Sequence, residues 1–359
     1  MTHAVDVLIV GSGPTGLTLA CHLVRRGARV RVVDRRSAPH RESRGKALHV
    51  ASLEVFDTLG VTGRMTETGR TGLAFRKYFD GEHINDTPRG GSSIFIGQWQ
   101  IEEILRDKLA ESGVGVEYEA EVEAVSQDAD GVRVTLTDGR TLGAAYLAGC
   151  DGGSSTVRKR LGIGFEGRTA DEEAMVVGDV TAAGLSRDYW HQWFTSDGGA
   201  MMLCPIPGTD TFQLQASPET DDRGERLAPS LQGFQRLFDR HARMPGIRLA
   251  DATWLSTWRV NVRMADRMRQ GRCFLAGDAA HVHPIAGGLG MNTGVQDAAA
   301  LGRVLGGVLT ATAGEEALDD YEAERLPAAA ALLADTSARH ERVRAAVREP
   351  GHGIEAALS

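Results

Sequence analysis

The sequence predicts an α/β fold in which a parallel sheet with covering helices is interrupted by a mainly antiparallel domain and followed by C-terminal helices. Residues 5–10, 30–33 and 273–276 are short, continuous apolar runs, which are typical of parallel strands buried on both faces. Residues 175–258 instead show alternating strands, such as 212–215, and contain four of the five tryptophans. A chain of 359 residues is long enough for two such domains.

Composition and charge exclude several classes of protein. The net charge is -8 and no long run of Lys or Arg occurs, so we expect no nucleic-acid partner. The four cysteines form no C-x-x-C pair, which favours reduced thiols in a cytoplasmic protein without a metal site. Glycines interrupt the apolar residues near the N-terminus, and no basic leader precedes them. We therefore expect neither a targeting segment nor a membrane partner.

The first motif is a G-x-G-x-x-G pattern directly after residues 5–10. Its glycines permit a tight turn, a close approach to a pyrophosphate and close packing of the next helix, whose apolar residues recur at helical spacing from Leu17 to Val24. Asp34 ends the second strand, as a partner of a ribose hydroxyl does. A glycine-rich turn without a ligand is the alternative, but the complete strand–turn–helix–strand–acid order favours a dinucleotide. The predicted cofactor contacts here are Gly11, Ser12, Gly13, Pro14, Thr15, Gly16, Asp34 and Arg35.

The middle of the chain divides the two domains. Residues 48–59 and 102–109 are expected helices, residues 69–97 leave the first domain, and residues 116–147 form a meander with turns at Asp130-Gly131 and Asp138-Gly139. We expect the first domain to comprise residues 1–70, 98–174 and 263–348, the second to comprise residues 71–97 and 175–262, and residues 349–359 to be a tail.

A second motif lies far along the chain, after the strand at residues 273–276. Asp278 is positioned to bind a ribityl hydroxyl, and a glycine-rich loop then leads into a helix that starts near Met291. The N-terminal N–H groups of that helix would face the electron-rich N1/O2 end of an isoalloxazine. The motif therefore predicts a flavin, hence FAD, and its predicted contacts are Gly277, Asp278, Pro284, Gly288, Gly290, Met291 and Asn292.

With these motifs, the sequence closely resembles the class A flavin monooxygenases, the para-hydroxybenzoate hydroxylase family. A third motif of that family is matched by Asp151, Gly152, Ser155 and Arg158. The resemblance implies an FAD-binding, Rossmann-like domain of that family's type with an inserted substrate domain. It also implies FAD contacts at Arg44, Gln98, Val122 and Asp151, with Gln100 as the alternative to Gln98, and an NAD(P)H-binding or structural role for Arg158.

Within the family, the chain is most similar to bacterial aromatic polyketide and phenol hydroxylases, although we expect no thioredoxin-like C-terminal domain. The resemblance implies that NADPH or NADH reduces the flavin transiently, that O2 forms a C4a-hydroperoxide, and that a phenolic, polyketide-like substrate is hydroxylated. The alternatives are a related flavoenzyme that performs Baeyer–Villiger oxidation, epoxidation, halogenation or dehydrogenation, and a flavin-binding scaffold or redox sensor without turnover. We expect a monomer or a homodimer.

The acid or base that assists the reaction is not identified by any motif. His281 flanks the flavin loop, but it belongs to the second motif that is common to the family, which favours a structural role. His191 lies between Trp190 and Trp193 in the expected substrate sheet, and it is either a pocket residue or a surface histidine. Neighbouring residues in a strand face opposite sides, so only one of the two sets that alternate here can face a ligand.

Overall fold

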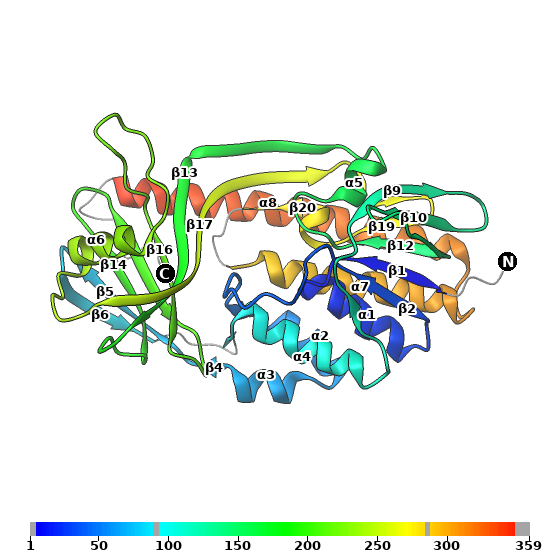
Figure 1. The fold of residues 1–359 in the computed structure, drawn as a ribbon, viewed down its shortest axis with the longest axis horizontal. Coiled ribbons are helices and arrows are strands. Elements are labelled where there is room, and N and C mark those ends of the chain that lie inside the picture. Colours follow the sequence, from blue (N-terminus) through cyan, green and yellow to red (C-terminus); the bar gives the residue numbers. More distant parts are fainter. Residues whose placement is uncertain (1–4, 89–92, 284–287, 349–359) are drawn as a thin grey trace.

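The computed structural model describes residues 5–88, 93–283 and 288–348, and it does not describe the side chains of residues 171–173 and 339–348. Two large sheets lie at opposite ends of an elongated molecule (Figure 1). One sheet is mostly parallel and covered by helices, and the other is mostly antiparallel. This arrangement confirms the predicted α/β fold with an inserted antiparallel sheet.

The parallel sheet has six strands in the order β18-β19-β12-β1-β2-β8. These strands are Arg269–Gln270, Cys273–Leu275, Tyr146–Gly149, Val7–Val10, Val30–Val33 and Val116–Glu117, respectively. All are parallel except β18, which pairs antiparallel with β19. All four residues of β1 are buried, as expected for a central strand covered on both faces.

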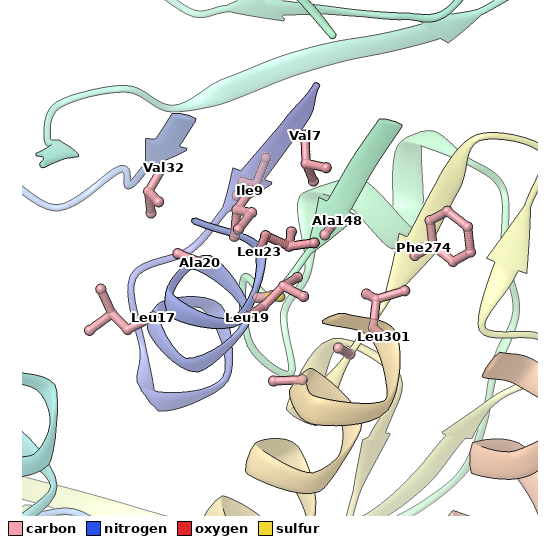
Figure 2. Close-up of a cluster of buried hydrophobic side chains, with 14 of the residues drawn as sticks. Val7, Ile9, Leu17, Leu19, Ala20, Leu23, Val32, Ala148, Phe274 and Leu301 are labelled. Carbon is pink, nitrogen blue, oxygen red and sulfur yellow. The ribbon is translucent and has the colours of Figure 1, made fainter. Parts of the chain in front are cut away.

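Helices α1 (Pro14–Arg25) and α7 (Gly290–Leu309) pack together beside this sheet. Figure 2 shows Leu23 of α1 beside Ile9 of β1, Leu19 on the side of α1 toward Leu301 of α7, and Leu17 on the opposite side of α1. All five of these side chains are fully buried. Burying each leucine contributes about 1.5–3 kcal/mol to folding.

Further helices and strands surround the parallel sheet. The remaining helices on this side are α2 (Val50–Leu59), α3 (Thr62–Thr68), α4 (Gln98–Ala110), α5 (Thr156–Arg160) and α8 (Leu318–Arg348), together with the 3-10 turns η1 (Gly277–Ala279) and η2 (Glu315–Ala317). The predicted meander is present as β9 (Val122–Gln127), β10 (Val132–Leu136) and β11 (Thr141–Ala144). A small sheet joins β3 (Ala47–Leu48), β7 (Ile94–Phe95) and β4 (Arg70–Thr71).

The second large sheet has eight strands in the order β20-β17-β13-β16-β15-β14-β5-β6. They are His281–Val282, Leu249–Ala265, Phe165–Ala182, Thr211–Ala216, Ala200–Pro205, Tyr189–Phe194, Ala74–Phe79 and Glu82–Thr87. Only β14 and β5 pair in parallel. Helix α6 (Leu231–Ala242) covers one face of this sheet, where Trp193 lies 5.7 Å from Phe238 between ring centroids.

The opposite face of the eight-stranded sheet is turned toward the first domain. The Nζ of Lys46 lies 4.5 Å from the ring centroid of Trp190 on this face, and Asp179 and Gln213 contact Ser43. Alternate residues of β14 therefore have different surroundings, as the pleat of a strand requires. Trp190 and Gln192 face the first domain, whereas His191 and Trp193 face α6.

The domain division stays a proposal. Its boundaries at residues 174/175 and 262/263 fall inside β13 and β17, two long strands that reach from the antiparallel sheet to α5 and β20 (Figure 1). The boundary at residues 70/71 divides β4, and the boundary at residues 97/98 lies directly before α4. Within the described part of the chain, no helix is both long and apolar enough to cross a membrane.

Candidate functional site

The turn between β1 and α1 has little room for side chains. Gly11 has a φ of +103°, which side chains rarely tolerate, and a Cβ at Gly11 would overlap the backbone of Cys150. A Cβ at Gly16 would overlap the carbonyl oxygen of Gly11. At Gly13, by contrast, a Cβ would meet no atom within 4 Å, so the space over the start of α1 is open. An open space at a helix N-terminus suits a pyrophosphate, and this geometry fits the predicted FAD.

Asp34 ends β2 and is held by several hydrogen bonds. Its carboxylate accepts from the N–H and the hydroxyl of Ser12, both at 2.8 Å, and from the guanidinium of Arg36 at 2.8 Å. Burial tends to raise the pKa of Asp34, but these hydrogen bonds outweigh burial and lower the pKa to about 2. The predicted neighbour Arg35 is exposed, and Arg36 is the arginine that pairs with Asp34.

A cavity of about 390 Å³ extends from the β1–α1 turn to the start of α7. Its lining brings together predicted residues that are as many as 280 positions apart in the sequence, from Gly11 to Met291. The predicted residues that line it are Gly11, Gly13, Pro14, Thr15, Asp34, Arg35, Arg44, Gln98, Val122, Asp151, Asp278, Gly290 and Met291. The lining also includes Arg36, His40, Glu102 and Glu121, which the sequence analysis did not select.

Four other predicted residues support the cavity without lining it. Ser12 is buried against Asp34, and Gly16 allows α1 to pack against the turn. A Cβ at Gly277 would approach the Thr15 hydroxyl to 2.5 Å. Asn292 accepts from the N–H of His49 at 2.8 Å and donates to the carbonyl of Ala47 at 3.0 Å. Gly288 is exposed with a φ of +63°, and Pro284 lies outside the described residues.

The loop that carries Asp278 is anchored by a buried charge cluster. Asp297 of α7 pairs with the Nε2 of His281 at 2.6 Å and with the Nε of Arg325 of α8 at 2.7 Å, and it accepts from the N–H of Gly277 at 3.0 Å. His281 and Asp297 are at most 1% exposed. His281 therefore has a structural contact, as the sequence analysis favoured, and the cluster fixes the position of Asp278 beside the cavity.

Residues of the third motif, Asp151 to Arg158, also contact the loop that carries Asp278. Asp151 accepts from the backbone N–H of Thr156 at 2.7 Å, and so caps α5. Arg158 is buried and donates to the carbonyls of Ala279 at 2.8 Å and Gly153 at 2.9 Å. These contacts favour the structural role for Arg158, because both hydrogen bonds hold the backbone beside the cavity.

The choice between Gln98 and Gln100 depends on where each side chain lies. Gln98 lines the cavity, accepts from the N–H of Gly45 at 3.2 Å and donates to Glu102 at 2.9 Å. Gln100 instead caps the start of α4, where it accepts from the N–H of Gly97 at 2.8 Å. The position of Gln98 favours it as the cofactor contact.

His191 is neither a pocket residue on the face turned to the first domain nor a surface histidine. It is 1% exposed and lies on the α6 side of the sheet. One ring nitrogen lies 3.2 Å from the hydroxyl of Tyr78, and the other lies 2.7 Å from the carbonyl of Ser186. Burial lowers the pKa of His191 to about 4. The suggestion that it acts as acid or base is therefore corrected, because its ring is enclosed in the core.

Comparison of the sequence with a family model and with other proteins shows which family the chain belongs to. The profile of the family described as "FAD binding domain" matches residues 4–336. The chain is 41% identical to a "Flavin-dependent monooxygenase" of Mycobacteroides abscessus over 96% of this chain and 76% of that protein. It is 40% identical to "6-methylpretetramide 4-monooxygenase" of Streptomyces rimosus over 92% of this chain, but this covers only 61% of that protein.

The fold is also shared with solved structures. A ternary complex of aklavinone-11 hydroxylase with FAD and aklavinone superimposes with a TM-score of 0.81 at 30% identity, covering 94% of this chain and 69% of that chain. Within the described residues, no group of three or more His, Cys, Asp or Glu side chains is arranged to hold a metal ion.

Proposed function

We propose that this chain, which belongs to the FAD-binding family of flavin-dependent monooxygenases, hydroxylates a phenolic, polyketide-like substrate. The family resemblance and the predictions of FAD and of an FAD-dependent monooxygenase are confirmed by the family match and by the relatives. The observation that carries the proposal is the cavity that joins the β1–α1 turn to the loop of Asp278. Arg44, which lines this cavity, is hydrogen-bonded to Gln213 of the eight-stranded sheet.

The residues of this chain hold FAD at three places. The N-terminus of α1 and the open space at Gly13 receive the pyrophosphate, with Arg44 beside it, and Asp34 lies where a ribose is bound. Asp278 and the N-terminus of α7 receive the flavin end. When bound and reduced by NADPH or NADH, FAD supplies the activation of O2 from which one oxygen atom passes to the substrate.

The proposed substrate surface is the face of the eight-stranded sheet that is turned toward the first domain. Trp190 of β14 lies on it, and the strand register adds Trp254 and Trp258, which pair with Asp179 and Met175. Residues directly opposite one another in an antiparallel pair share a face. Aromatic side chains with a few buried amides, such as Gln192, suit a planar, multi-ring phenol.

The test is a screen of purified, FAD-loaded protein against phenols of increasing ring number. We expect multi-ring phenols to stimulate NADPH or NADH oxidation, and the product made under ¹⁸O2 to carry one labelled oxygen by mass spectrometry. A product without label would indicate dehydrogenation. Oxidation of the nicotinamide that no phenol stimulates would favour a redox sensor or a scaffold.

We also propose that the protein works in the cytoplasm as a monomer or homodimer. Its four cysteines are free and buried, which suits a reducing compartment. Light scattering coupled to size-exclusion chromatography would give the oligomeric state, and a mass above that of two chains would contradict this proposal.

A further inference from the structure

The turn that carries Arg44 has a strained backbone. Arg44 has a φ of +36°, in the left-handed region that residues other than glycine seldom occupy. Such a conformation persists only where surrounding contacts enforce it. The Arg44 side chain is 49% exposed and lines the cavity, so the strain lies in a residue that faces the proposed cofactor.

The contacts that enforce this turn come from the other domain. Asp179 of β13 accepts from the N–H of Ser43 at 2.7 Å and from its hydroxyl at 2.5 Å. The Nε2 of Gln213 in β16 donates to the carbonyl of Arg44 at 2.7 Å and to the Ser43 hydroxyl at 2.6 Å. The turn is thus held from both sides of Arg44 by residues 136 and 169 positions away in the sequence.

The contacts are buried and directional. Ser43, Asp179 and Gln213 are each 1% exposed. The Oε1 of Gln213 accepts from Lys46 and, at 3.0 Å, from Gln215, so its Nε2 is the atom left to donate to Arg44. The first domain adds a contact, because Gln98 accepts from the N–H of Gly45 at 3.2 Å. The backbone of Arg44 is therefore fixed at the edge of the cavity that the residue lines, and its guanidinium pairs with Glu42.

We infer that Asp179 and Gln213 are positioning residues for FAD, which act through the Arg44 turn although they belong to the sheet that would carry the substrate. The inference rests on the proposed function, because it takes FAD as the group that Arg44 contacts. Neither Asp179 nor Gln213 lines the cavity. Their removal should nevertheless weaken FAD binding, because Arg44 would leave its strained conformation.

The test is an FAD titration of apoprotein, followed by quenching of flavin fluorescence, for Gln213→Met, Asp179→Asn and Arg44→Ala. Methionine keeps the length of the glutamine side chain but removes its donor. We expect each single variant to raise the Kd for FAD by about threefold to tenfold, the range expected from the loss of one or two hydrogen bonds. Thr181→Val on β13 is the matched control, because the Thr181 hydroxyl bonds Asp251 and does not touch the Arg44 turn, and its Kd should equal that of the wild type.

A double-mutant cycle separates a positioning role from a merely structural one. If Gln213 acts through Arg44, then Gln213→Met should add no further loss of FAD affinity to a protein that already carries Arg44→Ala. Additive losses would overturn the inference. So would an unchanged Kd in Gln213→Met and Asp179→Asn when Arg44→Ala weakens binding, and in that case the proposed function would stand.

Two further outcomes complete the design. If Arg44→Ala leaves the Kd unchanged, the assigned contact of Arg44 with FAD fails, and the inference fails with it although the wild type binds FAD. Thermal unfolding of each apoprotein checks folding. If Asp179→Asn does not fold, Gln213→Met and its cycle with Arg44→Ala decide the question alone.

Discussion

The turn between β1 and α1 and the loop of residues 276–283 after β19 contribute to the same cavity, but different forces hold them in place. The turn is fixed by close backbone packing, since Gly11 and Gly16 leave no room for a Cβ. The loop is fixed by charge, through Asp297 with His281 and Arg325. The turn should therefore respond to added atoms, and the loop to lost charges and to pH.

The largest expected effect comes from Asp297→Asn. The substitution leaves His281 and Arg325 buried without their carboxylate, and removing one member of a buried ion pair typically costs about 3–5 kcal/mol of unfolding free energy. Urea denaturation of the apoprotein measures this loss. Asp266→Asn, at an exposed ion pair with Arg267, is the control and should change stability by less than about 0.5 kcal/mol. A similar small change in Asp297→Asn would contradict the role of charge in the loop.

Gly16→Ala should have the next largest effect. Its Cβ would overlap the carbonyl oxygen of Gly11, and forcing atoms into a packed site costs about 1–3 kcal/mol. Gly13→Ala is the matched variant, because its Cβ meets no atom within 4 Å. We expect Gly13→Ala to leave the melting temperature of the apoprotein unchanged but to weaken FAD binding. Equal destabilisation by both substitutions would argue against packing as the force that holds the turn.

The pH dependence of stability should distinguish the two regions further. Burial opposes the charging of His281, but the carboxylate of Asp297 outweighs it and raises the pKa of His281 above 6.5. This contribution to stability is complete below pH 6.5 and is lost as the pH rises through the folded-state pKa. Urea midpoints across this window should fall in the wild type and in Gly16→Ala, whereas His281→Gln should lack the step. An unchanged step in His281→Gln would assign it to another group.

The smallest expected effect concerns the two neighbouring arginines after β2. Arg36→Met removes the ion pair with Asp34, which is largely buried, and should cost about 1 kcal/mol. Arg35→Met should change stability by less than about 0.5 kcal/mol, since Arg35 is exposed. Thermal unfolding of the two variants side by side tests the difference. A larger loss for Arg35→Met would reverse the assignment.

The packed turn was predictable from the sequence, whereas the charged loop was predictable only in part. Gly11, Gly13, Gly16 and Asp34 lie within one strand–turn–helix–strand unit, so their spacing alone reveals the geometry. Asp297 and Arg325 have no such local signature, because their meeting depends on how α7 and α8 pack. The side of the sheet that His191 faces was likewise undetermined until the register of β14 was known. Asp179 and Gln213 contact Ser43 only through the tertiary fold.

The continuity of β13 and β17 limits how the protein can be recombined with its relatives. These strands pair from Phe165 with Ala265 to Ala182 with Leu249, so one ladder belongs to both halves of the molecule. A substrate domain grafted from a relative must be joined at residues that face each other across the ladder, such as Ala170 and Val260. A junction that is displaced by one residue on one strand would turn Trp254 and Asp179 to opposite faces of the sheet.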